Sequence, residues 1–208
     1  MPPNNRPWER AARRNRDDRK QLALRTRILI VCEGAKTEPN YFKRFPVAEV
    51  FDVEVIGTGR NTDSLVEDAI RRRNRAESDG QPFNEVWCVF DRDSFTPQNF
   101  NRARQIAFNE HIRTAMSHEA FELWYLLHFN FHDAGISRKT YGDRLTQALN
   151  QKYLKNMPNI YDLLIGRQAD AIRNATTLLN RYPRWNPEAH NPSTNVHQLV
   201  QRLNELAE

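Results

Sequence analysis

Short apolar runs separated by amphipathic segments fill the first part of the chain. The runs are rich in β-branched and aromatic residues, which is typical of β-strands. The predicted strands cover residues 26–32, 51–57, 86–90 and 111–117. The first alternates only weakly between apolar and polar positions, as expected of a central strand covered on both faces. The segments between the strands predict helices that begin near Thr37 and cover 63–76 and 96–110.

The rest of the chain is helical in character. Residues 119–131 are apolar on nearly every face, which predicts a buried helix, and further helices are expected over about 137–151, 160–182 and 193–207. Residues 182–194 are rich in proline and asparagine and are expected to form a loop. Strands that alternate with helices predict an α/β fold with a mostly parallel four-stranded sheet flanked by helices. The predicted parts are an N-terminal arm, a core and a helical C-terminal extension packed on the core, over residues 1–25, 26–135 and 136–208.

The formal net charge of +5 is concentrated at the N-terminus. Residues 1–27 hold nine basic and three acidic side chains, a net charge of +6, which leaves about −1 for the rest of the chain. This composition predicts a disordered or partly helical arm. The arm is expected either to attach loosely to phosphate backbones or to be a solvated tail that improves solubility.

The cysteines and the apolar runs indicate the compartment. No apolar run approaches the roughly 20 residues needed to cross a membrane, and the N-terminus has no signal-peptide segment. Cys32 and Cys88 lie inside apolar runs, which favours buried free thiols, with a disulfide between neighbouring strands as the alternative. We therefore expect a cytoplasmic protein with no membrane partner.

Acidic side chains follow two of the predicted strands. Glu33 comes directly after the first strand, and Asp91 and Asp93 come after the third. Ligands of open parallel sheets lie at the carboxyl ends of the strands, and the two aspartates are about 6.6 Å apart along an extended chain. Oxygen ligands favour Mg²⁺ or Mn²⁺, so these three acids predict a metal site. Asp91 is expected to lie at the surface, at the end of its strand. The alternative is a solvated turn in which Asp93 or Ser94 caps the next helix.

A further acid interrupts the predicted buried helix. Glu122 is surrounded by apolar residues, and a lone buried carboxylate is costly unless it is paired or bound to a metal. It is expected either to join the metal site or to form a salt bridge with Arg92 or Arg113. Glu38, His118 and Arg92 are expected to support the site from behind its ligands.

Basic and glycine-rich positions lie near the proposed crevice. Lys36 and Glu38 follow the first strand, and Gly59 and Arg60 follow the second. Gly59 permits a close approach of the backbone, while Arg60 and the next helix start would suit a phosphate. The alternative is a tight turn whose last residues cap that helix.

The residues that carry these features resemble a known family. VCEGAKTEPNYF (31–42) followed by VFDRDSF (89–95) is similar to the Toprim pattern of a glutamate after the first strand and paired aspartates after the third. The whole chain resembles the RloB-like family of bacterial defence proteins, also through GTGRNTDSLVEDA, AFELWYLLHF and NPSTNVHQLV. The resemblance implies a Toprim-like core, a divalent metal and phosphodiester chemistry. It also implies a toxin-like effector encoded beside a restriction system or an ABC-type ATPase.

The resemblance also assigns roles to individual residues. It implies that Glu33 is the acid/base glutamate, that Asp91 and Asp93 are metal ligands, and that Glu122 is a further site acid. The sequence departs from the family pattern at His118 and Glu119, where the family has an asparagine–proline pair. The motif that contains Ser193, Thr194 and His197 matches the family, and a helix N-cap is the expected explanation for it.

These features lead to one main functional hypothesis and to alternatives from other classes. The main hypothesis is a Mg²⁺- or Mn²⁺-dependent Toprim nuclease, cleaving RNA such as tRNA in abortive-infection phage defence. Lys36 would be catalytic, and Lys36, Gly59 and Arg60 would bind the substrate phosphate. The alternative is a non-catalytic subunit that binds a metal–nucleotide or a phosphate, alone or as a homo-oligomer. A primase ranks lower, as does a topoisomerase, which needs a nucleophilic tyrosine in a further domain.

Overall fold

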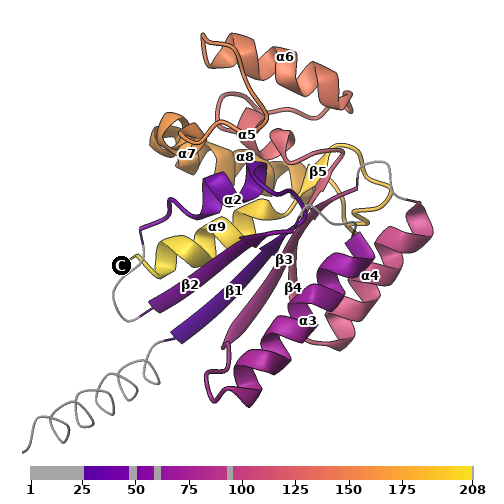
Figure 1. Ribbon diagram of the computed structural model, residues 1–208. Helices are drawn as coiled ribbons and strands as arrows, with labels where there is room; N and C mark the ends of the chain where they lie inside the picture. The colour runs from indigo at the N-terminus through magenta and orange to yellow at the C-terminus, as the bar shows by residue number, and fades with distance from the viewer. Residues whose placement is uncertain (1–25, 47–50, 59–61, 93–95, 208) are drawn as a thin grey trace, which may run out of the picture.

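The structure is a computed structural model that describes residues 26–46, 51–58, 62–92 and 96–207 (Figure 1). A five-stranded sheet runs through it in the order β2-β1-β3-β4-β5. Four strands are parallel: β1 (Thr26–Cys32), β2 (Phe51–Gly57), β3 (Glu85–Asp91) and β4 (Arg113–His118). The predicted α/β class and mostly parallel sheet are therefore confirmed.

The sheet contains one strand more than the sequence pattern predicts. β5 (Ser193–Thr194) pairs antiparallel with the end of β4, through Ser117 and His118. The prediction of four strands was wrong because two residues are too few to show an alternating pattern. They also lie in a segment rich in proline and asparagine, which predicts a loop. The C-terminal part of the chain thus completes the sheet as well as packing on it.

Helices cover both faces of the sheet (Figure 1). α3 (Thr62–Ser78) and α4 (Pro97–Asn109) lie on one face. The other face is covered by α2 (Thr37–Phe42), α5 (Glu122–Leu127), α8 (Gln168–Asn180) and α9 (Val196–Glu205). Beyond this layer lie α6 (Arg138–Ala148), α7 (Ile160–Leu164) and a 3-10 turn, η1 (Ile165–Arg167). Three predicted helices are clearly shorter than expected: 119–131 is reduced to α5, 137–151 to α6 and 193–207 to α9. The predicted helix 160–182 is divided by η1.

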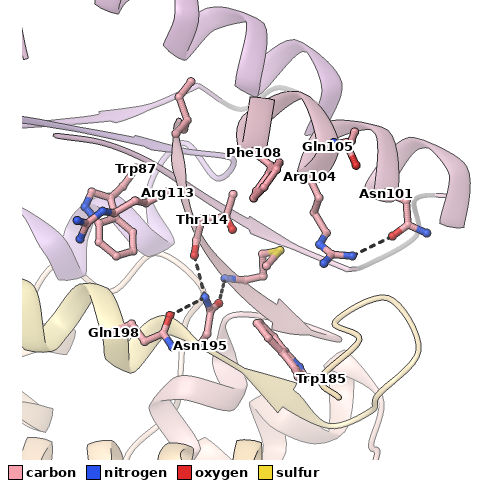
Figure 2. Close-up of a pocket in the computed structure, with 12 residues that line it drawn as sticks. Trp87, Asn101, Arg104, Gln105, Phe108, Arg113, Thr114, Trp185, Asn195 and Gln198 are labelled. Atoms are coloured by element: carbon pink, nitrogen blue, oxygen red, sulfur yellow. Dashed lines mark hydrogen bonds between the residues drawn. The ribbon is translucent and has the colours of Figure 1, made fainter. Parts of the chain in front are cut away.

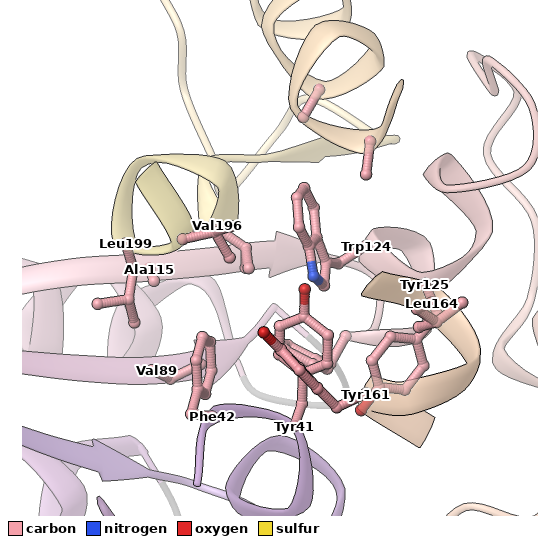
Figure 3. Packing of buried hydrophobic residues seen from close by; sticks show 14 of the residues in the cluster. Tyr41, Phe42, Val89, Ala115, Trp124, Tyr125, Tyr161, Leu164, Val196 and Leu199 are labelled. Atoms are coloured by element: carbon pink, nitrogen blue, oxygen red, sulfur yellow. The ribbon is translucent and has the colours of Figure 1, made fainter. Parts of the chain in front are cut away.

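Each face of the sheet has its own hydrophobic core. In β1, Ile28 and Ile30 face the helices of the C-terminal part, while Leu29 and Val31 face α3 and α4, and all four are fully buried. Figure 3 shows the larger core, in which aromatic rings such as Tyr41 are packed edge-to-face. The expectation that the first strand is covered on both faces is confirmed.

The cysteines and helix starts follow the expected local chemistry. Cys32 and Cys88 are buried free thiols, as expected, and they belong to different cores. The cap of α4 is Thr96, which accepts a hydrogen bond from the Asn99 N–H (3.3 Å), so the suggested cap at Asp93 or Ser94 was wrong. Ser137 caps α6 in the same way, accepting from the Thr140 N–H (3.3 Å).

Candidate functional site

The carboxyl ends of β1 and β3 bring two of the predicted acids together. The backbone N–H of Glu33 donates to the Val89 carbonyl (2.9 Å), so the residue after β1 still follows the sheet. The Glu33 Oε2 atom accepts a hydrogen bond from the backbone N–H of Asp91 (3.1 Å). The parallel register that pairs Cys32 with Val89 is the reason for this proximity, because it sets both strand ends at one level.

Asp91 is the last residue of β3 and is buried rather than at the surface, with 8% of its surface exposed. Its Oδ2 atom lies 3.3 Å from the Arg138 guanidinium, at the start of α6. Its Oδ1 atom has no hydrogen-bond partner among the described residues. Burial raises the pKa of Asp91 well above its usual value, the charges of Glu38, Glu122 and Glu33 raise it further, and Arg138 opposes them. Four carboxyl groups therefore share one small region of low polarity.

Glu38 lies closer to the centre of this group than its predicted supporting role suggests. It is in the first turn of α2, has 4% of its surface exposed, and its Oε2 atom has no hydrogen-bond partner in the described part of the chain. Burial raises its pKa, and the charge of Glu122 adds to the effect. Its carboxylate lies against Gly34, where a Cβ atom would collide with it. The glycine after Glu33 therefore leaves the space that Glu38 fills.

Gly57 supports the same loop from the end of β2. A Cβ atom there would lie 2.7 Å from the carbonyl oxygens of Gly34 and Ala35 and 2.7 Å from Cγ of Pro39. Two of these atoms are backbone, so the loop would have to move. We expect Gly57→Ala to lower the free energy of unfolding by about 1–2 kcal/mol. Chemical denaturation checks this, with Gly166→Ala as the control because a Cβ there meets nothing within 4 Å. Equal stability of the two variants would contradict the prediction.

Glu122 is held by a tyrosine instead of an arginine. It is the first residue of α5, has 3% of its surface exposed, and its Oε1 atom accepts a hydrogen bond from the Tyr153 hydroxyl (3.1 Å). Both predicted salt bridges are wrong: Arg92 pairs with Glu188 (3.3 Å) and Arg113 with Glu85 (3.5 Å). Burial raises the pKa of Tyr153, and the charge of Glu122 adds to the effect, so the hydroxyl remains a donor at neutral pH.

The other predicted site residues lie at the margin of the acids or outside the described residues. Lys36 is exposed at the N-cap position of α2. Arg92 and His118 are half-buried beside Asp91 and Ser117, at the ends of β3 and β4. Burial lowers the pKa of His118, and the charge of Arg92 lowers it further. Three predicted residues lie outside the described part of the chain: Gly59, Arg60 and Asp93.

The chemistry of these donors suits a hard divalent cation, but the described residues provide only part of a site. Carboxylate oxygens are the preferred ligands of Mg²⁺ and Mn²⁺, and the Oδ1 atom of Asp91 and the Oε2 atom of Glu38 are both without a partner among the described residues. Within the same part of the chain, no group of three or more Asp, Glu, His or Cys side chains is arranged to hold a metal ion. The predicted ligand Asp93 is outside that range, so the three-acid metal site stays a prediction.

A comparison with protein-family models matched the description "RloB-like protein" over residues 28–203. The chain belongs to the RloB-like protein family. The resemblance inferred from the motifs is thus confirmed at the level of the family. No curated protein and no solved structure matched the chain in the corresponding comparisons.

The RloB-like match includes the motif around Ser193, which contacts both the start of α9 and strand β4. Asn195 occupies the N-cap position of α9, and its side chain does not cap the helix. Thr194 donates to the Met116 carbonyl (3.0 Å) and contacts the Ser117 hydroxyl (3.0 Å). Its hydroxyl also accepts from the N–H of Val196, the first residue of α9 (3.3 Å). His197 is buried, and burial lowers its pKa to about 4. This part of the RloB-like chain closes the edge of the sheet.

Among the described helices of the chain, none combines the length and apolar character that a membrane span requires.

Sequence reasoning missed two side chains of the RloB-like site and undervalued a third. Arg138 and Tyr153 lie far from the acids in sequence, in the α6 region, and no local motif marks them. Glu38 has a local signal: it is the only acid in the first turn of α2, directly after the glycine-containing loop. A polar residue that is buried next to a glycine is a position where a search for site residues should begin.

Proposed function

We propose that this RloB-like protein is a divalent-metal-dependent phosphodiesterase that cleaves nucleic acid, with RNA as the expected substrate. One observation carries the proposal: Glu33 and Asp91 meet at the carboxyl edge of a mostly parallel sheet, where the charges of Glu38 and Glu122 also act on Asp91, and Asp91 buries an oxygen that has no partner among the described residues. Like charges in a buried site repel one another unless protons, arginines or a cation intervene. Among the described residues, Arg138 pairs with Asp91 and the charge of Lys155 acts on Glu38, so two positive charges oppose four carboxyl groups and a further cation would reduce the remaining repulsion.

Each residue has a distinct part in this proposal. Asp91 and Asp93 would hold a Mg²⁺ or Mn²⁺ ion, which when bound polarises a phosphate and makes a bound water more acidic. Glu33 is half-exposed and fixed by the Asp91 N–H, so it is placed to accept or pass on a proton at the open side of the site. Lys36 is exposed at the same loop and can face a phosphate. Tyr153 holds the Glu122 carboxylate in one orientation.

The finer points of the proposal come from the resemblance. A Toprim-type core, RNA such as tRNA as the substrate, and a role in phage defence by abortive infection are all proposals that the family membership supports. An ABC-type ATPase or a restriction system is the corresponding partner. A cytoplasmic location agrees with buried free thiols.

The direct test is cleavage by the purified full chain. Labelled RNA and DNA are incubated with Mg²⁺, with Mn²⁺ and with a chelator, with and without the proposed ATPase partner. We expect cleavage of RNA only when the metal is present. Absence of metal-dependent cleavage of either nucleic acid, even with the partner supplied, would overturn the proposal.

A second candidate is a subunit that binds a metal–nucleotide or a phosphate without cutting. The ion pair between Arg138 and Asp91 favours it, because the guanidinium already neutralises part of the charge that a catalytic cation would meet. Calorimetry with Mg²⁺–nucleotides separates the two candidates. A tight complex whose nucleotide stays intact for hours would support the binding subunit over the enzyme.

A further inference from the structure

An open cavity of about 960 Å³ lies along the outer side of β4 (Figure 2). One wall is the surface of α4, which contributes Arg104 and Phe108, and the other wall is the segment that carries Trp185 and Asn195. We call this cavity the α4 groove. Among the described residues that line it, two are arginines, several are carboxamides and aromatic rings, and none is acidic. The charge of the groove is therefore suited to an anion.

Arg104 is the residue that points most directly to an anionic ligand. It is half-buried, and the one side-chain hydrogen bond that it makes to a described residue goes to the neutral Asn101 (3.1 Å). Burial lowers its pKa, and the charge of Glu188 opposes this only in part. The arginines at the end of α3 are different, because each forms an ion pair with a carboxylate (Arg71, Arg72, Arg73 and Arg75). A half-buried guanidinium with a neutral partner is stabilised when an anion binds beside it.

Aromatic side chains give the α4 groove a second property. Phe108 has 77% of its surface exposed, more than any other large hydrophobic residue in the described part of the chain. Trp185 lies on the opposite side, and its indole N–H is buried without a hydrogen-bond partner among the described residues. Exposed rings beside arginines and carboxamides are typical of surfaces on which nucleic-acid bases stack.

The hydrogen bonds at the edge of β4 favour a nucleic acid over a peptide strand. β5 covers only the end of β4, and an exposed strand edge is a place where an extended peptide can add to a sheet. Asn195 already occupies this edge: its Oδ1 atom accepts from the Met116 N–H (2.6 Å) and its Nδ2 atom donates to the Thr114 carbonyl (2.8 Å). The side chain thereby takes the place of a further strand and blocks the addition of one.

The α4 groove leads toward the acids. Asp91 in β3 pairs with Ser117 in β4. Arg113, which lines the groove, lies four residues before Ser117 in β4, about 13 Å along the strand at 3.3 Å per residue. Glu188, three residues after Trp185, binds Arg92, the residue that follows Asp91. The segment that forms one wall of the groove is thus tied to the candidate site.

We propose that the α4 groove binds a single-stranded segment of nucleic acid, with a phosphate at Arg104 and a base stacked on Phe108. This inference rests on the proposed function for the class of ligand, and it adds a binding surface outside the acids. The groove holds one part of the strand while another part reaches the carboxylates at the edge of the sheet.

The test measures binding of the full chain in EDTA, where no metal-dependent cleavage takes place. The probes are a fluorescein-labelled oligouridylate of about 12 nucleotides and its DNA counterpart, followed by fluorescence anisotropy. Arg104→Glu is compared with Arg102→Glu, which makes the same charge change at an exposed position of α4 that does not line the groove. Phe108→Ser is compared with Phe131→Ser, another exposed phenylalanine outside the groove.

We expect Arg104→Glu to weaken binding at least about tenfold and Phe108→Ser about fivefold or more, while both controls change it less than about twofold. Arg104→Gln should lower the slope of log affinity against log salt by about one, the signature of a lost phosphate contact. Thermal melting shows whether each variant is folded, and Arg104→Gln provides the test if Arg104→Glu is not.

Three results would overturn the groove as a nucleic-acid site. They are no binding by the wild type, equal loss of affinity in Arg104→Glu and Arg102→Glu, and an extended peptide that binds through Arg104 where the oligonucleotide does not. The same measurements distinguish failure of the groove from failure of the proposed function. Arg104-dependent binding without any cleavage would remove the enzyme and keep the groove, whereas cleavage with Arg104-independent binding would remove only the groove.

Discussion

Asp91→Asn is expected to lower metal-dependent cleavage by at least about 10³-fold while the protein stays folded. The substitution keeps the shape of the side chain but removes the negative charge that would hold the cation and that pairs with Arg138. Loss of a group that stabilises charge in the transition state typically costs two to three orders of magnitude, and loss of a metal ligand should cost at least as much. The measurement is the initial rate of RNA cleavage at saturating Mg²⁺, together with calorimetry of Mg²⁺ binding.

Stability separates loss of chemistry from loss of structure in this variant. Burial and three neighbouring acids make the charged form of Asp91 unfavourable, so an uncharged side chain relieves repulsion and offsets the loss of the Arg138 ion pair. The melting temperature of Asp91→Asn without metal should therefore not fall. Asp79→Asn is the control, since Asp79 is exposed at the end of α3 and pairs only loosely with Arg75 (3.7 Å). An Asp91→Asn protein that keeps more than about a tenth of the wild-type rate would contradict the assignment.

Those parts of the fold that depend on local pattern were predicted well from the sequence. All four parallel strands lie within a few residues of their predicted positions, because runs such as 26–32 combine β-branched residues with burial on both faces. The start of α4 follows from Thr96 and Pro97, a capping residue and a proline in the first turn. These signals lie within a few residues of the structure that they specify.

The rest depends on contacts between distant residues. β5 exists because Ser193 and Thr194 find a partner in β4, more than seventy residues earlier, as the 77-residue separation between Ser117 and Thr194 shows. Helix α5 is shorter than its apolar run predicts, because an apolar run marks burial and does not mark where a helix ends. No local pattern could specify either feature.

The candidate site shows the same division. The proximity of Glu33 and Asp91 follows from a rule about strand ends, and their hydrogen bond is consistent with it. The partners of Asp91 and Glu122 do not follow from such a rule. Arg92 and Arg113 were expected for Glu122, yet Glu122 is bound by Tyr153, and Asp91 is bound by Arg138. These partners could not be foreseen because they lie at the start of α6 and in the segment after it, which reach the acids through tertiary packing that no local pattern specifies.

Glu38→Gln should have the largest effect on stability, with a gain of about 2–3 kcal/mol in the free energy of unfolding of the metal-free protein near neutral pH. Glu38 is almost fully buried, its Oε2 atom has no partner in the described part of the chain, and the charge of Glu122 acts against its own. Hydrogen bonds from the backbone of Glu38 and Gly34 and the charge of Lys155 offset only part of these effects, since the pKa of Glu38 is still raised. A buried and incompletely paired ion costs several kcal/mol, part of which the isosteric amide recovers. The control is Glu67→Gln, at an exposed position of α3.

The gain from Glu38→Gln should depend on pH in a specific direction. Burial raises the pKa of Glu38 in the folded chain above its unfolded value of about 4.3, so the folded protein binds the proton more tightly than the unfolded one. The wild type therefore loses stability as pH rises from about 4 through the folded pKa. The two proteins should be equally stable below about pH 4 and should differ most at neutral pH. Chemical denaturation across this range gives the difference.

Buried histidines change stability with pH in the opposite direction, but they do so equally in the wild type and in Glu38→Gln. Burial lowers the pKa of His128 and of His197 to about 4, so both proteins lose stability as pH falls below about 6.5, to the same extent. Addition of Mg²⁺ near neutral pH should stabilise the wild type and narrow its difference from Glu38→Gln, because a bound cation removes the repulsion that the amide also removes. If the difference in the free energy of unfolding between the two proteins did not depend on pH, the pKa of Glu38 would not be raised in the folded chain. A difference that Mg²⁺ leaves unchanged would mean that the cation binds elsewhere.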